Sequence, residues 1–435
     1  MPPNSQLIAD YSLPITVRTG IGKPFSSLAT GLVLLLTVVL PPLGHLAFGT
    51  SSMAVGVFFV SGLYIFMYIV SCAIHRQSQN LKASVFLVSV VLGVVIAHDV
   101  ISFLLNDDFD YYRFWQTYLL LIFFLFGATF FVLLSHRLSD FHADYAVKLV
   151  FYVLLLSGVA GILNFSPFVP EAGGRSVLFF SEPSHFALSF LPFLLYMTVT
   201  ANEKMKLLLI LVGYATGLLL QNMTMVVGVI LISVLVVPIK TFLLLTPVAL
   251  LPFYFTDMNI GYYSSRLVLS IHSQNLSAMV HLSGLERAYL NFKETLGLGV
   301  GFQQFGIIGS RGEAMYFVEK LAGMESNLLD GGTMVSKFVG EFGFLGVIML
   351  LVYLVYFVKI AIWLNKVSVS NMASHYYKGI FFLSCFIMYC MDLFVRGTGY
   401  FSPTGFLFVT SLIWIKRSKS PNSGDSFGQC RRIYT

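Results

Sequence analysis

The stretch from Gln116 to Ser135 reads QTYLLLIFFLFGATFFVLLS and contains no charged residue. A bilayer core needs about 20 mostly apolar residues per helix, so this stretch predicts a membrane-spanning helix. Runs of the same kind recur along the chain, and we expect spans at residues 28–48, 53–74, 81–105, 116–135, 146–165, 184–201, 205–221, 223–238, 240–256, 336–360, 377–395 and 400–415. The sequence therefore predicts an all-α, polytopic membrane helix bundle of about twelve transmembrane helices.

The composition of the whole chain supports this prediction. Of its 435 residues, 57% are hydrophobic and 11% are charged, and the mean hydropathy is +0.82. These values lie outside the range of soluble globular domains. Residues 1–27 are polar and rich in proline around their start, without an apolar stretch that leads to a small-residue cleavage site. We expect a cytoplasmic segment there and no signal peptide.

The positions of lysine and arginine predict the orientation. Most of the 26 basic residues fall in loops that face the cytoplasm if the N-terminus lies inside, as the positive-inside rule requires. With an even number of spans, both termini are then cytoplasmic. We expect nine helices within residues 28–256, a large periplasmic loop at 257–335, three helices within 336–415 and a basic cytoplasmic tail at 416–435.

The remaining basic residues lie on the expected outside and are mostly arginines. They are Arg113, Arg175, Arg266, Arg287, Lys293, Arg311, Lys320, Lys337 and Arg396. The planar guanidinium of arginine binds phosphate oxygens with two hydrogen bonds and stays protonated at working pH. This set therefore indicates recognition of a phosphate group. The alternative is that these side chains only solvate the loops or pair with acidic neighbours.

The large loop contains an amphipathic segment followed by glycines. From His281 to Leu296, apolar side chains recur at helical spacing and form one stripe, which predicts a helix that could lie on the membrane surface. The stripe consists of Leu282, Leu285, Tyr289, Phe292 and Leu296. Glycines follow at positions 297, 299, 301 and 306. They permit close approach of the backbone to a ligand, or sharp turns.

Ionisable residues occur where the sixth expected span begins. Glu182 and His185 flank Pro183 and Ser184 there. A helix cap formed by Ser181 or Glu182 explains part of this pattern, since proline suits a first helical turn. Ionisable groups at the edge of an apolar bundle are costly and usually functional. We therefore predict Glu182 as the first candidate for a general base and His185 as the second.

Two further charged pairs leave alternatives open. His98 and Asp99 interrupt the third span and either carry a function or reach the membrane interface. Asp392 and Arg396 are four residues apart, so they either form a local ion pair or face a site. The sequence contains no nucleotide-binding fingerprint and no recognisable metal cluster. We expect no metal, no cofactor and no nucleic acid partner.

Three segments resemble the O-antigen polymerases (Wzy) of the wider O-antigen polymerase and ligase superfamily. They are FSEPSHFA at 180–187, RAYLNFKETLGLGVGF at 287–302 and EFGFLG at 341–346. The resemblance in topology covers nearly the whole chain. It implies a GT-C-type membrane glycosyltransferase with its active site facing the periplasm, in the bacterial inner membrane. Such an enzyme transfers a growing glycan from undecaprenyl pyrophosphate to an incoming lipid-linked repeat unit in lipopolysaccharide or exopolysaccharide biosynthesis.

The resemblance also implies roles for particular residues and partners. Arginines of two external loops are important in this family, and the matching positions are Arg175, Arg266 and Arg287. They would hold the donor pyrophosphate, while Glu182 or His185 acts on the acceptor hydroxyl. Supporting roles are expected for Arg311, Arg396, Gly299 and Gly301. The implied partners are the undecaprenyl-pyrophosphate-linked donor and acceptor, membrane lipid and a chain-length-regulating co-polymerase.

Two other functions are weighed against polymerisation. Many O-antigen ligases carry a His-Asn pair just before the helix that follows the large loop, whereas this chain has Glu325-Ser326-Asn327 there. Family members also often place a Ser-Arg pair after the seventh helix, where residues 221–225 read QNMTM. A flippase or other transporter of the lipid-linked sugar would suit the many spans and the intramembrane His98 and Asp99. Transporters usually show paired repeats around a midplane site, and the sequence shows no repeat.

Overall fold

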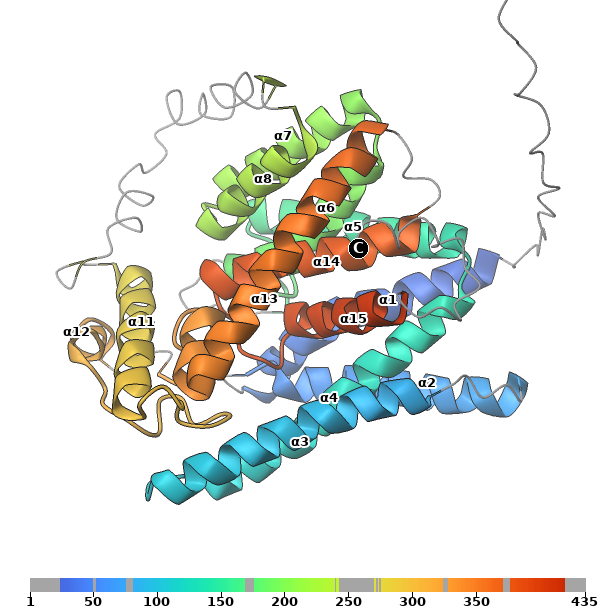
Figure 1. Cartoon of the computed structure of the whole chain (residues 1–435). Coiled ribbons are helices and arrows are strands. Elements are labelled where there is room, and N and C mark those ends of the chain that lie inside the picture. The colour runs from blue at the N-terminus through green and yellow to red at the C-terminus, as the bar shows by residue number, and fades with distance from the viewer. Residues whose placement is uncertain are drawn as a thin grey trace, which may run out of the picture.

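The computed structural model describes residues 24–49, 52–75, 81–168, 176–238, 240–241, 270, 273, 275–323, 328–370 and 376–418. These residues fold mainly into helices (Figure 1). The helices are α1 (Pro24–Phe48), α2 (Ala54–His75), α3 (Lys82–Leu105), α4 (Tyr111–Arg137), α5 (Asp140–Ile162), α6 (Pro183–Thr200), α7 (Glu203–Leu219), α8 (Met223–Val236), α11 (Leu276–Glu294), α12 (Glu313–Ala322), α13 (Met334–Ser370), α14 (Tyr377–Phe394) and α15 (Pro403–Ser418).

The helices confirm the predicted membrane bundle in its main outline. Every expected span except 240–256 coincides with a described helix, and that one lies outside the described residues apart from 240–241. Within the described chain, seven helices are long and apolar enough to cross a membrane: α1, α2, α3, α4, α5, α13 and α14. The apolar helix α8 is shorter. The protein is therefore embedded in a membrane by several spanning helices.

The helix α6 occupies the centre of the bundle. Its residues are buried without interruption from Phe186 to Val199, and it packs against α5, α7, α8 and α14. A helix that is apolar on all sides belongs inside a bundle, because no face of it needs water. The rings of Phe186 and Phe190 stack at 5.4 Å. This enclosure fixes the position of the first turn of α6, where Glu182 and His185 lie.

The helix α13 is kinked where a glycine-rich loop docks against it. Gly343 has φ 55° and ψ −128°, inside the element Met334–Ser370. The amide of Phe344 donates to the carbonyl of Gly297 at 2.7 Å. A Cβ atom on Gly343 would lie 1.9 Å from that carbonyl oxygen, so only glycine fits there. The stretch EFGFLG therefore contains the kink of α13 and the surface against which the glycine-rich loop docks.

The helices α11 and α12 lie together beyond one end of the bundle, and α11 runs across the direction of α14 and α15 (Figure 1). We call this end the α11 end. The predicted helix at 281–296 is confirmed, and it begins earlier, after the N-cap residue Asn275. Glu286 on α11 accepts hydrogen bonds from the amides of Glu313 and Ala314, at 2.9 and 2.7 Å. These bonds satisfy free amides at the start of α12 and join the two helices.

Candidate functional site

The site begins at Glu182, the residue directly before α6. Glu182 occupies the N-cap position in an extended conformation, and its side chain forms no cap hydrogen bond. Instead its Oε2 accepts hydrogen bonds from Arg396 Nη2 at 2.9 Å and from Ser184 Oγ at 3.0 Å. The carboxylate thus pairs with an arginine that is distant in the sequence. Glu182 occupies the N-cap position of α6, but its side chain contacts Arg396 and Ser184 and does not cap the helix.

His185 lies one turn further along and shares this cluster. Its Nε2 is 4.0 Å from Glu182 Oε2, and the charges of Arg396, His45 and Asp330 also act on the imidazole. The predicted acid and imidazole are therefore brought together, and Arg396, predicted only in a supporting role, lies directly on the acid. We call Glu182, His185 and Arg396 the α6-mouth cluster.

The charges in the cluster set the protonation state of Glu182. Partial burial raises the pKa of this carboxyl, but Arg396, His185 and the hydroxyl of Ser184 lower it more, to about 2. The group is therefore ionised at neutral pH. Its side chain is still 47% exposed, so a ligand can reach it. Removal of the neighbouring cation would raise the pKa and make the carboxylate a stronger base.

Arg396 follows the end of α14, and its neighbour Asp392 does not hold it. Asp392 accepts hydrogen bonds from the amide of Thr398 at 2.8 Å, from the hydroxyl of Thr398 and from the hydroxyl of Thr404. These contacts organise the turn between α14 and α15. Arg396 therefore pairs with Glu182, as described above, and Asp392 pairs with the hydroxyls of the turn.

His281 on α11 also lies within range of the charge of Arg396. Burial and, second, the charge of Arg396 lower its pKa. The connection runs through glycines: the amide of Gly397 donates to the carbonyl of Gly332 at 2.8 Å. A Cβ atom on Gly332 would lie 3.1 Å from the Cα of His281. The turn at 331–332 therefore lies between α11 and the residue after Arg396.

A second charged group, not predicted from the sequence as part of a site, lies beside the cluster. The side chain of Lys337 is only 2% exposed. Its Nζ donates to the carbonyl of Leu329 at 2.9 Å, lies 3.3 Å from Asp330 Oδ1 and sits 5.2 Å from the ring centre of Tyr400. The hydroxyl of Tyr400 donates to Glu341 Oε2 at 2.7 Å. Lys337 was visible in the sequence as an external cation, but no local pattern indicated Asp330 or Tyr400.

The glycines after α11 serve contacts within the protein. Gly299 and Gly301 have φ of +85° and +100°. A Cβ atom would lie 2.3 Å from the carbonyl oxygen of Glu341 at the first position, and 2.7 Å from Asp99 Oδ1 at the second. In this structure the close backbone approach is therefore to α13 and α3, and the supporting role of these two glycines at a ligand stays a prediction.

The pair His98 and Asp99 holds the same loop. His98 Nε2 lies 2.9 Å from the carbonyl oxygen of Leu298, and Asp99 Oδ1 accepts the amide of Phe302 at 2.5 Å. Both side chains thus anchor the glycine-rich loop to α3. This contact explains why polar groups interrupt that span near its end.

Arg287, which the family resemblance assigns to the donor pyrophosphate, is buried. Its side chain is 1% exposed. The guanidinium carbon lies 5.9 Å from the ring centre of Phe305, and Nη2 donates to the backbone carbonyl of Arg311 at 3.4 Å. Arg287 therefore packs against the loop that follows α11. The side chain of Arg311 is exposed. Arg175 and Arg266 lie outside the described residues.

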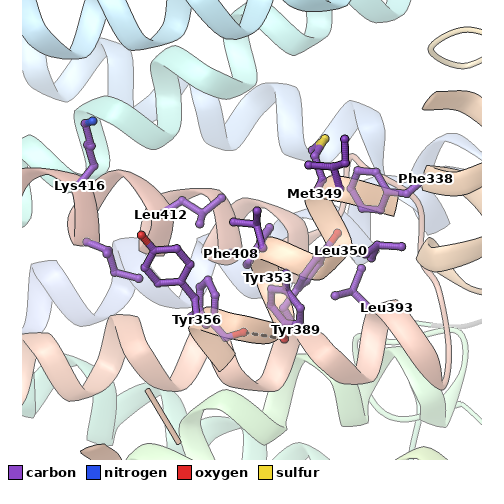
Figure 2. Close-up of a pocket in the computed structure, with 14 residues that line it drawn as sticks. Phe338, Met349, Leu350, Tyr353, Tyr356, Tyr389, Leu393, Phe408, Leu412 and Lys416 are labelled. Carbon is purple, nitrogen blue, oxygen red and sulfur yellow. Dashed lines mark hydrogen bonds between the residues drawn. The ribbon is translucent and has the colours of Figure 1, made fainter. Parts of the chain in front are cut away.

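An apolar groove of about 390 Å³ runs between α13, α14 and α15 (Figure 2). Figure 2 shows Phe338 near one end and Lys416 at the other. Between them the lining is apolar or aromatic, and Tyr389 stacks on Phe408 at 4.0 Å. The Phe338 end reaches the site, because Phe338 packs against Tyr400 at 5.3 Å and the lining residue Leu393 precedes Arg396 by one helical turn.

Within the part of the chain that the structure describes, no three His, Cys, Asp or Glu side chains form a group that could hold a metal ion. Metal independence stays a prediction, which polymer formation with and without a chelator would test. Comparison of the chain with protein-family models, with curated proteins and with solved structures finds no match.

Proposed function

We propose that this chain is a membrane glycosyltransferase that polymerises lipid-linked repeat units. It transfers a growing glycan from undecaprenyl pyrophosphate to the sugar end of an incoming repeat unit, on the periplasmic face of a bacterial inner membrane. The observation that carries this proposal is the ion pair between Arg396 and Glu182 beside the apolar groove. One site then offers a cation for phosphate, a carboxylate for a hydroxyl group and an apolar surface for a lipid chain.

The groove suits the isoprenoid chain of the donor. Each buried methylene group contributes about 0.8 kcal/mol to binding, and the aromatic lining adds a large contact area at little cost in side-chain entropy. Because Leu393 lies one turn before Arg396, a chain bound in the groove carries its head group towards the guanidinium. The pyrophosphate of a polyprenyl donor is that head group.

The proposed reaction is a substitution at the anomeric carbon of the donor sugar. A hydroxyl oxygen of the acceptor forms the new bond, and the bond from that carbon to the pyrophosphate oxygen breaks. The leaving undecaprenyl pyrophosphate takes the electron pair, and Arg396 stabilises its developing charge. The hydroxyl proton passes to Glu182. His185, with its Nε2 4.0 Å from that carboxylate, is the second candidate for the base.

The ion pair couples donor binding to activation of the base. Glu182 is a weak base while Arg396 holds it, because the cation keeps its pKa near 2. An incoming pyrophosphate competes for the same guanidinium and loosens the pair. The pKa of Glu182 then rises towards the value that proton abstraction requires. Donor binding thus prepares the carboxylate for the acceptor.

The other arginines take different parts in this proposal. Arg287 packs against the loop at 301–311 and does not contact the donor. Arg175 and Arg266 remain proposed ligands of the pyrophosphate, from the family resemblance. Arg311 and the glycines at 299 and 301 have no direct role in the reaction.

Gene deletion in a host that makes the glycan separates the candidate functions. Loss of a polymerase leaves single repeat units exported and attached to their final acceptor. Loss of a flippase leaves none at the cell surface, and loss of a ligase leaves polymer on the lipid carrier. Complementation with wild-type protein and with Lys320→Ala should restore polymer, whereas Arg396→Ala should not. Polymer of normal length in the deletion strain would refute the proposal.

A further inference from the structure

The helix α11 turns apolar side chains outward from the protein. Tyr289 is 64% exposed and Leu285 is 40% exposed, and Leu296, two residues beyond the end of the helix, is exposed as well. The opposite face packs against the protein and is mixed, because it buries Met279 and Val280 together with the polar Arg287 and Asn291. In a soluble protein the outward side of a surface helix is mostly polar. The outward stripe of α11 therefore needs a partner other than water.

The charged residues of α11 are turned away from the stripe or lie at its edge. Glu286 caps α12, and Glu294 accepts the amide of Ser310 at 3.2 Å. Lys293 is exposed and follows Tyr289 by one helical turn. A lysine in this position can extend its ammonium group to the polar head groups while its methylene groups stay in an apolar layer.

The stripe is continuous with the outer surface of a membrane-spanning helix. Phe292 on α11 contacts Phe344 on α13, with ring centres 4.8 Å apart. Phe344 is 59% exposed, and Ile348, Leu351 and Val355 continue the same exposed face along α13. Because α13 is long and apolar enough to span the membrane, its exposed face meets lipid. The exposed stripe of α11 adjoins the end of that face.

We propose that α11 is an interfacial helix that lies in the plane of the membrane, with its apolar stripe inserted in the leaflet at the α11 end. Its partner is the bilayer itself: acyl chains contact Leu285, Phe292 and Leu296, and Tyr289 and Lys293 lie at the level of the head groups. This arrangement follows the physics of amphipathic helices that bind membranes from one side. The orientation of α11 across α14 and α15 agrees with it (Figure 1).

The interfacial position has a consequence for the α6-mouth cluster. His281 on α11 packs against the turn at 331–332, which bonds to the residue after Arg396. A helix held at the membrane surface therefore holds this cluster near the level of the lipid head groups. The inference stands independently of the reaction proposed above, because it concerns only where α11 lies.

Depth-dependent quenching tests the inference in the full-length protein. Tyr289→Cys and Leu296→Cys, each in a background without the four native cysteines, would carry a polarity-sensitive fluorophore in phosphatidylethanolamine–phosphatidylglycerol nanodiscs. The matched control is Glu319→Cys on α12, an exposed polar position. Only variants that elute like the wild type from size-exclusion chromatography would be compared.

We expect lipids with a nitroxide near the head group to quench the labels at 289 and 296 several-fold more strongly than the label at 319. Aqueous iodide should show the reverse order. Equal iodide quenching at all three positions would overturn the inference, because it would mean that the stripe faces water. Protection of 289 and 296 from both quenchers would also overturn it, in favour of a protein partner or a second copy of the chain.

Discussion

The Nη2 atom of Arg396 lies 2.9 Å from the Oε2 atom of Glu182, and this ion pair joins the end of α14 to the start of α6 across 214 positions of sequence. The groove between α13, α14 and α15 begins one helical turn before Arg396. A cation, a carboxylate and the apolar groove thus lie together at one end of the bundle.

Replacement of Arg396 should impair the reaction without unfolding the protein. Arg396→Ala should lower the rate of polymer formation by roughly 100- to 1,000-fold, the usual effect of losing one group that stabilises a leaving anion. Arg396→Lys should show an intermediate loss, because lysine keeps the charge and loses the two-pronged geometry. The control is Lys320→Ala, an exposed cation on α12. Wild-type rates for Arg396→Ala would remove this residue from the mechanism.

The ion pair should make stability depend on pH. The pKa of Glu182 is depressed from 4.5 to about 2 in the folded protein, so the unfolded chain binds its proton at higher pH. The stabilisation is therefore present above pH 4.5 and is lost as the pH falls towards 2. In detergent at pH 7 the wild type should have a higher Tm than Glu182→Gln. The difference in Tm should become smaller below pH 5. A difference that does not change with pH would contradict the assignment.

A side chain at the kink of α13 should disrupt loop docking. In Gly343→Ala the new Cβ would lie 1.9 Å from the carbonyl oxygen of Gly297, at a φ of +55°. Backbone strain and overpacking together should cost roughly 2–5 kcal/mol. The control Gly93→Ala adds a methyl group to α3 where nothing lies within 4 Å. Only the first variant should lose thermal stability in detergent, and equal behaviour of the two would show that the docking is not needed.

Arg287 should prove to be a supporting residue. Truncation of this large buried side chain to alanine should lower the free energy of unfolding by roughly 2–5 kcal/mol, whereas Arg311→Ala, at an exposed position, should leave it unchanged. The fraction of Arg287→Ala that folds should bind the donor with the KM of the wild type. Normal thermal stability together with a raised KM would instead support the role in pyrophosphate binding that the family resemblance implies.

Filling the groove should weaken binding of long-chain donors. Leu412→Trp places a bulky ring among the lining residues and should raise the KM for an undecaprenyl donor by about tenfold, the effect of excluding two methylene groups. A donor with a short isoprenoid chain should be affected less. Leu156→Trp, on the exposed face of α5, is the control. A KM for the undecaprenyl donor that stays at the wild-type value in Leu412→Trp would exclude the groove as the lipid site.

The sequence predicted the helices well because membrane helices depend on local composition. Unbroken apolar runs such as 116–135 need no knowledge of their neighbours, and the helix at α11 was visible from its stripe. The site was predicted only in part. Glu182 and His185 stood out because charge is rare at the edge of an apolar bundle, yet their partner Arg396 could not be assigned, since no local pattern records a contact across 214 positions.

Contacts within the protein could not be predicted for two kinds of residue. Arg287 was expected to hold a pyrophosphate because of the family resemblance, and in the structure it lies against Phe305 and the carbonyl of Arg311. The glycines at 299 and 301 were expected near a ligand, and they pack against the protein's own backbone and side chains. In both cases the residue type indicated a close contact correctly. What the sequence could not indicate was whether that contact is to a substrate or to another part of the chain.

The most direct test of the proposed function uses purified protein in nanodiscs with a single lipid-linked repeat unit as the only substrate. The account predicts that wild-type protein forms glycans of more than one repeat unit on undecaprenyl pyrophosphate and releases undecaprenyl pyrophosphate, with and without a chelator. Arg396→Ala should form them far more slowly under the same conditions. Repeat units that remain single under all conditions, while crossing the bilayer of proteoliposomes made with the same protein, would contradict the account and identify a transporter.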